Sequence, residues 1–382
     1  MDFNLPTESV EMQTATRDVV ERLLALEPAY HATGIVPDAV ETALREMGFY
    51  GMSIPEEYGG TPLDRITSTA IQLELARLPP QFWPFVRSAL GPGVHIIVDV
   101  GSEAIKKQWL PGIAAGTSRN CIAITEAHAG SDAAKMTTTA VRARDSSGDH
   151  YVLNGSKTFI SNANHAHTIT VLASTDRSQG KNGISAFLLD TTTPGFKVTR
   201  AMSTMGWMDD SLCEISFTDC RIPASHLLGE EGRGLRYAMT GMNEGRLNVG
   251  CQALGPATIA LEQTIEHAKT RVTFGQALAE HQAIRHMIAD MAMDLHAARM
   301  VLWEAVWRAE RGEDARLKAS MVKVICTEAA CRIADKALQI FGGSGYCRGT
   351  IVERVYRDLR VLRIYEGASE IHRNMIARLL LA

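Results

Sequence analysis

The stretch HYVLNGSKTFISN, residues 150–162, decides the fold, because it is rich in the β-branched and aromatic residues that favour strands. Similar short runs surround it from about residue 119 to residue 228, with turn signals at 146–149 and 191–195 between them. The other runs are NCIAITEA, TTTAVRARD, TITVLAST, GISAFLLD, FKVTRA and CEISFTDCRIP. This pattern predicts a separate middle domain, residues 119–228, folded as an antiparallel, barrel-like β domain.

The residues before the β-rich region are expected to form an all-α domain, residues 1–118. In PDAVETALREMG, Pro37 stands at the start and Gly48 at the end of an apolar stripe, as is typical of a helix. The stretches RITSTAIQLELARL and SEAIKKQWL read as further helices, and the glycines at 91–93 mark a break.

The residues after the β-rich region, 229–382, are expected to form a C-terminal four-helix bundle. Apolar residues between Ile284 and Ala305 recur at steps of four and three, which is the seam that bundle helices use. A second long helix is expected from about residue 315 to residue 341. The predicted fold class is therefore multidomain α and β, in the order helices, β domain and helical bundle.

The composition of the 382-residue chain is that of an ordinary globular protein, with 46% hydrophobic and 21% charged residues. Its 39 Lys and Arg are outnumbered by 43 Asp and Glu, so nucleic acid is not an expected partner. The seven cysteines form no CxxC pair, and no signal peptide or apolar run of about 18 residues is visible. These features predict a cytoplasmic protein that does not enter a membrane.

Several common catalytic motifs are missing from the sequence. GSGYCR fails as a dinucleotide fingerprint because Arg348 stands at the third glycine position. No P-loop, HExxH or GxSxG motif occurs, and His281 and His286 lie off the register of a helical metal pair. We therefore expect no metal site, no P-loop and no serine hydrolase.

The remaining candidates each have two interpretations. AITEAHAGSD, residues 123–132, could offer hydrogen bonds to a ligand or be a plain surface loop. Arg271 and Phe274 in RVTFG suit an anion beside a flat ring, and equally a helix C-terminus. The glycines of QIFGGSGY, residues 339–346, allow close approach of a ligand or simply cap a helix. Glu366, in RIYEGASEIHR, is a lone acid at a turn, and most such acids meet water.

Taken together, these stretches resemble the acyl-CoA dehydrogenase family along essentially the whole chain and in the family's order. The matching motifs are AITEAHAGSD, LNGSKTFISNA, FTDCRIP, RVTFGQALAEHQ, IADMAM, QIFGGSGY, YRDLR and IYEGASEI. The resemblance implies an N-terminal helical domain, a middle β domain and a C-terminal four-helix bundle, which agrees with the order predicted from the residues.

The resemblance also implies a reaction, the FAD-dependent oxidation of an acyl-CoA thioester to its trans-2-enoyl form. An α-proton must leave to a base and a β-hydrogen to the flavin, from opposite sides of the substrate. Glu366 matches the family's base, and an apolar pocket is expected to raise its pKa toward roughly 6 to 7. The Glu366 amide and an FAD hydroxyl would then hold the thioester oxygen, and Gly367 would leave that amide approachable.

The resemblance assigns further site residues. Those expected around the isoalloxazine are Thr125, Gly130, Ser131, Phe159 and Ser161. Those expected at the adenine and pyrophosphate end, from a neighbouring subunit, are Arg271, Phe274, Gln282, Gln339, Gly342 and Gly343. Those expected near substrate are Ser131, Arg246, Tyr365 and Gly367. A homotetramer and an electron-transfer flavoprotein as electron acceptor follow from the same resemblance.

Some residues depart from the family pattern. His128 stands in the first flavin loop where no imidazole is expected, and Phe159 and Ser161 replace a common Trp and Thr. One branch of the family takes its base from an earlier helix, where this chain has Gly245 beside Glu244. One residue is a rotation of about 100° on a helix, so Glu244 is expected to point away.

Two other functions stay open. One is a relative with different flavin chemistry, an oxidase or monooxygenase, and the other is a flavin-free helical scaffold. Trp207 and GMNEGR, residues 241–246, resemble the isobutyryl-CoA branch and hint at a short or branched acyl group. The sequence does not fix the acyl chain length.

Overall fold

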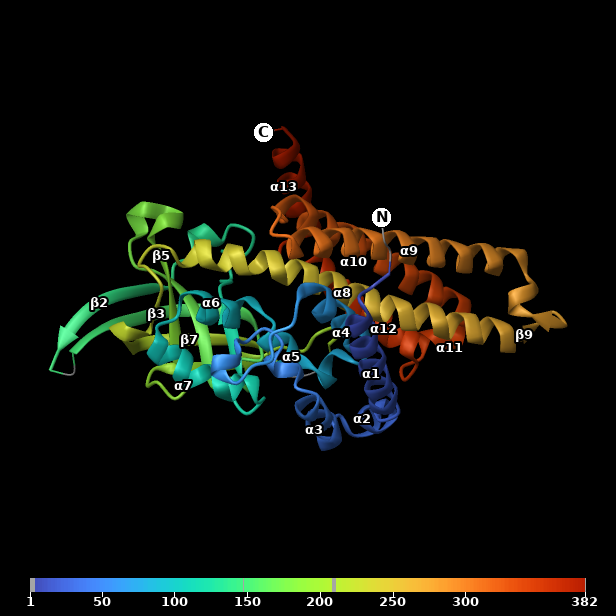
Figure 1. Cartoon of the computed structure of the whole chain (residues 1–382), viewed down its shortest axis with the longest axis horizontal. Helices are drawn as coiled ribbons and strands as arrows, with labels where there is room; N and C mark the ends of the chain where they lie inside the picture. The colour runs from blue at the N-terminus through green and yellow to red at the C-terminus, as the bar shows by residue number, and fades with distance from the viewer. Residues whose placement is uncertain (1–3, 147, 208–210, 382) are drawn as a thin grey trace.

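The computed structural model describes residues 4–146, 148–207 and 211–381. An N-terminal helical domain is followed by a middle β domain and a C-terminal helical domain (Figure 1), which confirms the predicted order. The domain limits at 118/119 and 228/229 remain predictions. Residues 208–210, within the stretch GWMDDSL, lie outside the described residues.

The N-terminal helices have the capping residues that their sequences predict. Asp64 caps its helix by accepting a hydrogen bond from the Thr67 amide at 2.9 Å, and Gly48 adopts φ +71° where the predicted helix of residues 37–48 ends. The helices are α1 (Thr7–Leu24), α2 (Glu27–Thr33), α3 (Asp38–Glu46), α4 (Arg65–Leu75), α5 (Pro84–Ala89), α6 (Pro92–Val100) and α7 (Glu103–Ala114).

Each β-rich run of the sequence forms a strand of one sheet. The strands are β1 (Asn120–Ala123), β2 (Thr139–Asp145), β3 (Gly148–Ser161), β4 (Thr168–Ser174), β5 (Ile184–Asp190), β6 (Phe196–Ala201), β7 (Leu212–Pro223) and β8 (Leu227–Leu228). Their order is β6-β7-β3-β2-β4-β5-β8, with β1 beside β4. Most neighbours are antiparallel, but β1 and β2 each run parallel to β4, so the purely antiparallel prediction was wrong. Strand composition carries no information on direction, and barrel closure remains a prediction.

The C-terminal domain consists of long helices packed side by side. They are α8 (Gly234–Thr270), α9 (Gln282–Glu310), α10 (Arg316–Phe341), α11 (Gly343–Tyr346), α12 (Ile351–Leu359) and α13 (Ser369–Leu381), with a small hairpin of β9 (Val272–Thr273) and β10 (Gln276–Ala277) after α8. Helices α8 and α10 approach closely at Gly250, where an added Cβ would lie 2.7 Å from Val322 Cγ1. The arrangement as a four-helix bundle remains a prediction.

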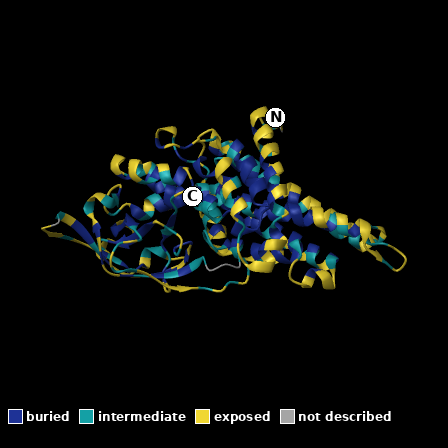
Figure 2. Ribbon diagram, turned by 90° about the horizontal axis from the view of Figure 1, so that it is seen from below, coloured by how far each residue is buried: buried dark blue, intermediate teal, exposed yellow. Residues whose placement is uncertain are grey.

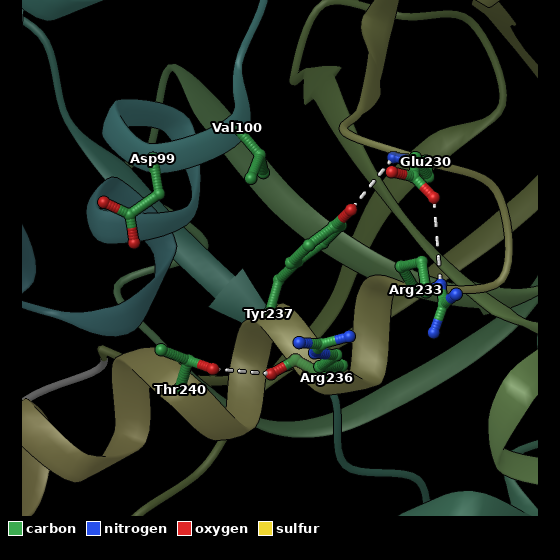
Figure 3. A pocket seen from close by; sticks show the side chains of 7 residues that line it. All are labelled: Asp99, Val100, Glu230, Arg233, Arg236, Tyr237 and Thr240. Carbon is green, nitrogen blue, oxygen red and sulfur yellow. Dashed lines mark hydrogen bonds and ion pairs between the residues drawn. The ribbon is translucent and has the colours of Figure 1, made fainter. Parts of the chain in front are cut away.

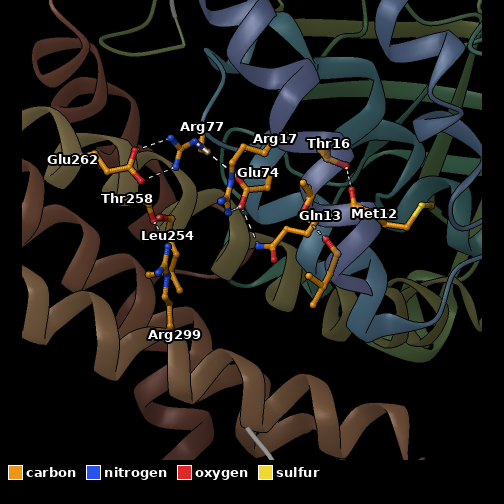
Figure 4. A network of polar contacts seen from close by, with 12 residues as sticks. Met12, Gln13, Thr16, Arg17, Glu74, Arg77, Leu254, Thr258, Glu262 and Arg299 are labelled. Atoms are coloured by element: carbon orange, nitrogen blue, oxygen red, sulfur yellow. Dashed lines mark hydrogen bonds and ion pairs between the residues drawn. The ribbon is translucent and has the colours of Figure 1, made fainter. Parts of the chain in front are cut away.

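Polar contacts join the first helices to the C-terminal domain (Figure 4). Glu74 on α4 accepts a 2.6 Å hydrogen bond from Arg17 on α1, and Arg77 donates at 2.6 Å to Glu262 on α8. The buried apolar residues form three clusters, one of them within the β domain, and Figure 2 shows buried residues along the inner faces of the helices and strands. In the described part of the chain, no helix combines the length and apolar character that crossing a membrane requires.

A buried ion pair joins α12 to α2. The Arg354 guanidinium donates to Glu27 at 2.5 Å, both side chains are at most 6% exposed, and Asp358 lies 3.8 Å from the same arginine. We expect Arg354→Met to cost about 3 to 5 kcal/mol, because two carboxylates would stay in the interior without their cation. The thermal midpoint of unfolding, followed by circular dichroism, measures the loss.

The matched control is Arg311→Met, which removes an exposed arginine paired with Glu313 at 3.6 Å. It is expected to cost less than about 1 kcal/mol, since exposed pairs contribute little. Equal shifts of the midpoint in the two variants would contradict this account of the α2–α12 contact.

Candidate functional site

Glu366 lies in a tight turn between a short 3₁₀ helix (Arg360–Arg363) and α13. Glu366 and Gly367 both adopt left-handed conformations, with φ +56° and +90°, which is strained for a glutamate. The His372 ring nitrogen Nε2 lies 3.0 Å from the Glu366 carbonyl oxygen, and a Cβ on Gly367 would come within 2.8 Å of that nitrogen. Glycine is therefore required here for the turn and for room beside His372.

The Glu366 carboxyl group faces α8. A Cβ added to Gly245 would lie 3.5 Å from Glu366 Oε2, an oxygen that is buried without a hydrogen-bond partner among the described residues. Burial raises the pKa of this carboxyl above its ordinary value, and the positive charges of Arg246 and Lys323 oppose that rise. The site therefore holds a carboxyl group that is poised to accept a proton.

Glu244 faces another part of the molecule. Its carboxylate accepts hydrogen bonds from the Arg65 guanidinium on α4 at 2.8 and 3.0 Å. One helical step thus turns Glu244 toward α4, while Gly245 faces Glu366.

Tyr365 connects the turn to the β domain. Its hydroxyl donates to Gln252 Oε1 on α8 at 2.5 Å, and its ring meets the edge of Trp207 with centroids 5.6 Å apart. The Arg87 guanidinium on α5 lies 4.0 Å from the Trp207 ring centroid. The next residue on α5, Ser88, accepts a 3.0 Å hydrogen bond from the Asn162 side chain at the end of β3.

The structure places Thr125 and Gly130, two of the predicted flavin residues, beside the strand that carries Phe159. The Thr158 amide donates to the Thr125 carbonyl at 2.9 Å, and a Cβ on Gly130 would lie 4.0 Å from the Thr125 methyl group. Phe159 adopts φ +58° with 60% of its surface exposed. Ser131 and Ser161 are also exposed, so this face presents an aromatic ring and hydroxyl groups to solvent.

A buried ion pair fixes the loop that carries these residues. The Lys157 ammonium, 0% exposed, donates to Glu126 Oε1 at 2.9 Å and to the Ile124 carbonyl at 3.0 Å. Glu126 also accepts from the Thr137 and Thr138 amides at 2.7 and 2.9 Å. Burial acts to raise the pKa of Glu126, but Lys157 and the hydrogen bonds prevail and lower it to about 2. The pair is ionised at neutral pH.

His128, the imidazole that departs from the family pattern, is a neighbour of this pair. Its Nε2 lies 3.6 Å from Glu126 Oε2, and its side chain is 56% exposed.

The second group of predicted flavin residues lies elsewhere. Arg271 ends α8, Phe274 is 98% exposed at the tip of the β9–β10 hairpin, and Gln282 begins α9. Gln339, Gly342 and Gly343 lie where α10 ends and α11 begins, and the rings of His267 and Phe341 stack at 4.1 Å between these helix ends. Figure 1 shows β9 and α11 at the end of the molecule opposite the β domain.

A hollow on the surface lies apart from these residues. It has a volume of about 390 Å³ and is found at the start of α8, where Tyr237 accepts a hydrogen bond from the Glu230 amide (Figure 3). It is lined by Asp99, Val100, Glu230, Arg233, Arg236, Tyr237 and Thr240. None of the predicted site residues lines it.

The sequence analysis did not single out four charged or ionisable residues of the site, Glu126, Lys157, Lys323 and His372. Two of them carry a signal. Lys157 is the only Lys or Arg inside the run of residues 150–162, and Lys323 falls on the apolar stripe of residues 319–334. A lysine at a position where the helical spacing predicts an apolar residue indicates a buried charge.

The comparisons with known proteins cover the whole chain. Three family profiles match, described as the N-terminal, middle and C-terminal domains of acyl-CoA dehydrogenase, at residues 6–117, 121–220 and 232–381. The short-chain specific acyl-CoA dehydrogenase of mouse mitochondria is 36% identical over 98% of this chain and 90% of that protein.

Solved structures agree with these matches. Butyryl-CoA dehydrogenase from Megasphaera elsdenii has a TM-score of 0.92 and 33% identity, with both chains fully covered. A chain from a structure described as the electron transferring flavoprotein of Acidaminococcus fermentans has a TM-score of 0.93 and 34% identity, also with full coverage of both chains.

The Glu126–Lys157 pair predicts how stability depends on pH. Because its pKa falls from the ordinary 4.5 to about 2, Glu126 contributes stability above about pH 4.5 that is lost as the pH falls through 2. Glu126→Gln removes that contribution and leaves Lys157 buried without its counter-charge, so at pH 7 we expect a loss of about 3 to 5 kcal/mol.

Thermal midpoints of wild type and Glu126→Gln at several pH values measure this effect. The difference between the two proteins should be largest near neutral pH and shrink as the pH falls from 4.5 toward 2. A difference that stays constant over this range would show that Glu126 does not titrate as described.

Proposed function

The chain belongs to the acyl-CoA dehydrogenase family, and from that premise we propose that it oxidises an acyl-CoA thioester to the trans-2-enoyl thioester, with Glu366 as the base that takes the α-proton. The observation that carries this proposal is the Glu366 carboxyl group, which is buried against Gly245 with an oxygen free of hydrogen bonds among the described residues. Family members are oxidoreductases and flavoproteins, so the chemistry class is that of a flavin-dependent dehydrogenase.

The residues of the turn would act on the substrate as follows. Glu366 abstracts the α-proton, and the raised pKa of its carboxyl makes it a stronger base than an exposed glutamate. The Glu366 amide donates to the thioester oxygen as negative charge develops there, an interaction worth about 3 to 4 kcal/mol when preorganised. His372 holds the Glu366 carbonyl group, and with it the orientation of the turn.

The first group of flavin residues fits an isoalloxazine ring. An exposed Phe159 held at φ +58° offers a face for stacking, and the exposed hydroxyl groups of Ser131 and Ser161 offer hydrogen bonds. Thr125 and Gly130 lie on the adjoining loop. When bound here, FAD supplies the acceptor for the β-hydrogen.

Arg246, Tyr365, Gly367 and Ser131 are proposed to contact substrate. Tyr365 is held by Gln252 and Trp207, and burial raises the pKa of its hydroxyl, so it stays protonated. The names of the mouse relative and of the Megasphaera elsdenii structure favour a short acyl chain. Anaerobic flavin bleaching by a panel of thioesters that includes butyryl-CoA and isobutyryl-CoA tests chain length and branching.

A second copy of the chain is proposed to complete the flavin site. The residues that would hold the adenine and pyrophosphate are Arg271, Phe274, Gln282, Gln339, Gly342 and Gly343. They belong to segments at or next to β9 and α11, at the end of the molecule opposite the β domain that carries the first group (Figure 1). A flavin could contact both groups only if two chains contribute, which supports the expected homotetramer.

The seven free cysteines suit a cytoplasmic location, and the Acidaminococcus fermentans match supports an electron-transfer flavoprotein as acceptor.

The alternative functions remain distinguishable. An oxidase or monooxygenase would consume oxygen rapidly during turnover with a thioester, whereas a dehydrogenase would need an added acceptor. A flavin-free scaffold would purify colourless and bind no FAD. An oxygen electrode and the absorbance of the purified protein therefore separate the three functions.

Glu366→Gln tests the base. The amide is nearly isosteric and cannot take a proton, so FAD and acyl-CoA should still bind while anaerobic bleaching slows about 10² to 10⁴-fold. Glu244→Gln is the matched control, one residue from Gly245 but paired with Arg65, and should bleach at near the wild-type rate. If Glu366→Gln bleached normally, or if only Glu244→Gln failed, the assignment would be rejected.

Phe274→Ala tests the two-chain site. Because Phe274 is 98% exposed in a single chain, the substitution should leave the thermal midpoint of the FAD-free protein unchanged. FAD retention, measured by equilibrium dialysis, should fall roughly tenfold if the ring packs against FAD bound to another copy, an aromatic contact worth about 0.5 to 1.5 kcal/mol. Unchanged FAD affinity, or a monomer by sedimentation, would contradict the proposal.

A further inference from the structure

Lys323 is a buried charge that the mechanism above does not use. It lies in α10, its side chain is 0% exposed, and its ammonium has no hydrogen-bond partner among the described residues. An ammonium held in the interior without a paired carboxylate costs several kcal/mol, and an apolar side chain of similar length would avoid that cost. The position of Lys323 therefore calls for an explanation other than packing.

The helix that carries Lys323 packs against both sides of the catalytic turn. Glu328 on α10 accepts from Arg373 on α13 at 2.8 Å and lies 3.8 Å from Arg363, which precedes the turn.

The charged groups around Lys323 act within this contact. Glu366 exerts the strongest attraction on its ammonium, followed by Glu370, while Arg246 and Arg363 repel it. Burial lowers the pKa of Lys323 to about 8, so the ammonium is charged at pH 7 and below.

Two cations act on the Glu366 carboxyl group, Arg246 from α8 and Lys323 from α10. His372, on α13, is neutral at pH 7 because burial lowers its pKa to about 4, and Tyr365 stays protonated. The cluster at the base is therefore one carboxyl group and two cations, drawn from three separate segments of the C-terminal domain.

We propose that Lys323 is a positioning residue whose ammonium keeps Glu366 ionised until the carboxylate takes the α-proton. The inference rests on the proposed function. Burial alone favours the protonated carboxyl, which is no base, so a compensating positive charge is needed. Arg246 is expected to contact substrate, whereas Lys323 is sealed in the core, so its charge acts on Glu366 before substrate arrives.

The test is Lys323→Met, which keeps the length of the side chain and removes the charge. The second-order rate constant for anaerobic flavin bleaching reports the ionisation of the free enzyme, and is measured from about pH 5.5 to pH 9.5. The probe is butyryl-CoA, or the thioester of the panel that bleaches fastest.

The loss of the cation should displace the acid limb of the profile upward by about one pH unit, that is, a tenfold slower reaction at low pH. Near pH 9 the Lys323 ammonium of wild type has itself lost its proton, since its pKa is about 8, so the rates of the two proteins should converge to within about threefold. An equal fall in the rate constant at every pH would mean that Lys323 only stabilises the fold. An unchanged pH profile would mean that the charge of Lys323 has no effect on the ionisation of Glu366. Either result overturns the proposal.

Lys336→Met is the matched control. Lys336 lies about 20 Å further along the same helix, where its ammonium pairs with Asp290 at 2.8 Å. The Lys336→Met substitution also removes one positive charge from α10, and the pH profile of the bleaching rate constant should stay unchanged. Lys323→Gln is a second variant with the same expectation as Lys323→Met, and failure of both to fold would show that the ammonium is held for stability, against the proposal.

A thermal cycle separates this inference from the proposed function. Lys323→Met should raise the midpoint more in a Glu366→Gln background than in wild type, because only wild type offers the ammonium a carboxylate. If the midpoint shifts of the two substitutions simply add, Lys323 and Glu366 are not coupled, and the proposed role of Lys323 fails whatever reaction the protein catalyses. If the shifts are coupled but Glu366→Gln still bleaches flavin, the proposed function fails while the charge coupling stands.

Discussion

The removal of water from the Glu366 carboxyl group is the constraint on which the site depends. A carboxyl group in the interior favours its neutral form, and the surrounding structure must supply positive charge or hydrogen bonds to keep it ionised. Here Oε2 has no hydrogen-bond partner among the described residues, and the compensation comes from Arg246 and Lys323. The carboxylate is thus stabilised by charges at a distance, which leaves its oxygen able to bind a proton.

The long helices of the C-terminal domain set this environment. Gly245 and Gln252 are seven residues apart on α8 and so share one face, where Gly245 makes room for the Glu366 carboxyl and Gln252 accepts from Tyr365. Close approach of α8 and α10 at Gly250 then packs Val322, the neighbour of Lys323, against α8. A side chain at Gly250 would push α8 and α10 apart, whereas a Cβ at Gly245 would lie in van der Waals contact with the Glu366 carboxyl group.

The order of domains and most elements followed from the sequence, because periodicity and turn residues report local structure directly. The strands of residues 120–223 and the helix ending at Phe341 are examples. Strand direction did not follow, since β1 and β4 pair across a long connection that no local pattern encodes. The Glu366 turn was found through its motif, yet its contact with Gly245 and its coupling to Lys323 join segments far apart in sequence. Spacing cannot reveal such contacts.

The hairpin after α8 argues that the molecule is incomplete as one chain. Phe274 adopts φ +53° and exposes almost its whole ring, and Val272 beside it is 59% exposed. A strained aromatic residue at an exposed tip gains no burial in the monomer, and the proposed contact with a second copy of the chain would offset the cost of that conformation. Arg271 adds a cation at the same place. An aromatic face beside an arginine suits a nucleotide with its phosphates, and in the proposed assembly the β domain of a second copy would supply the residues around the isoalloxazine of that nucleotide.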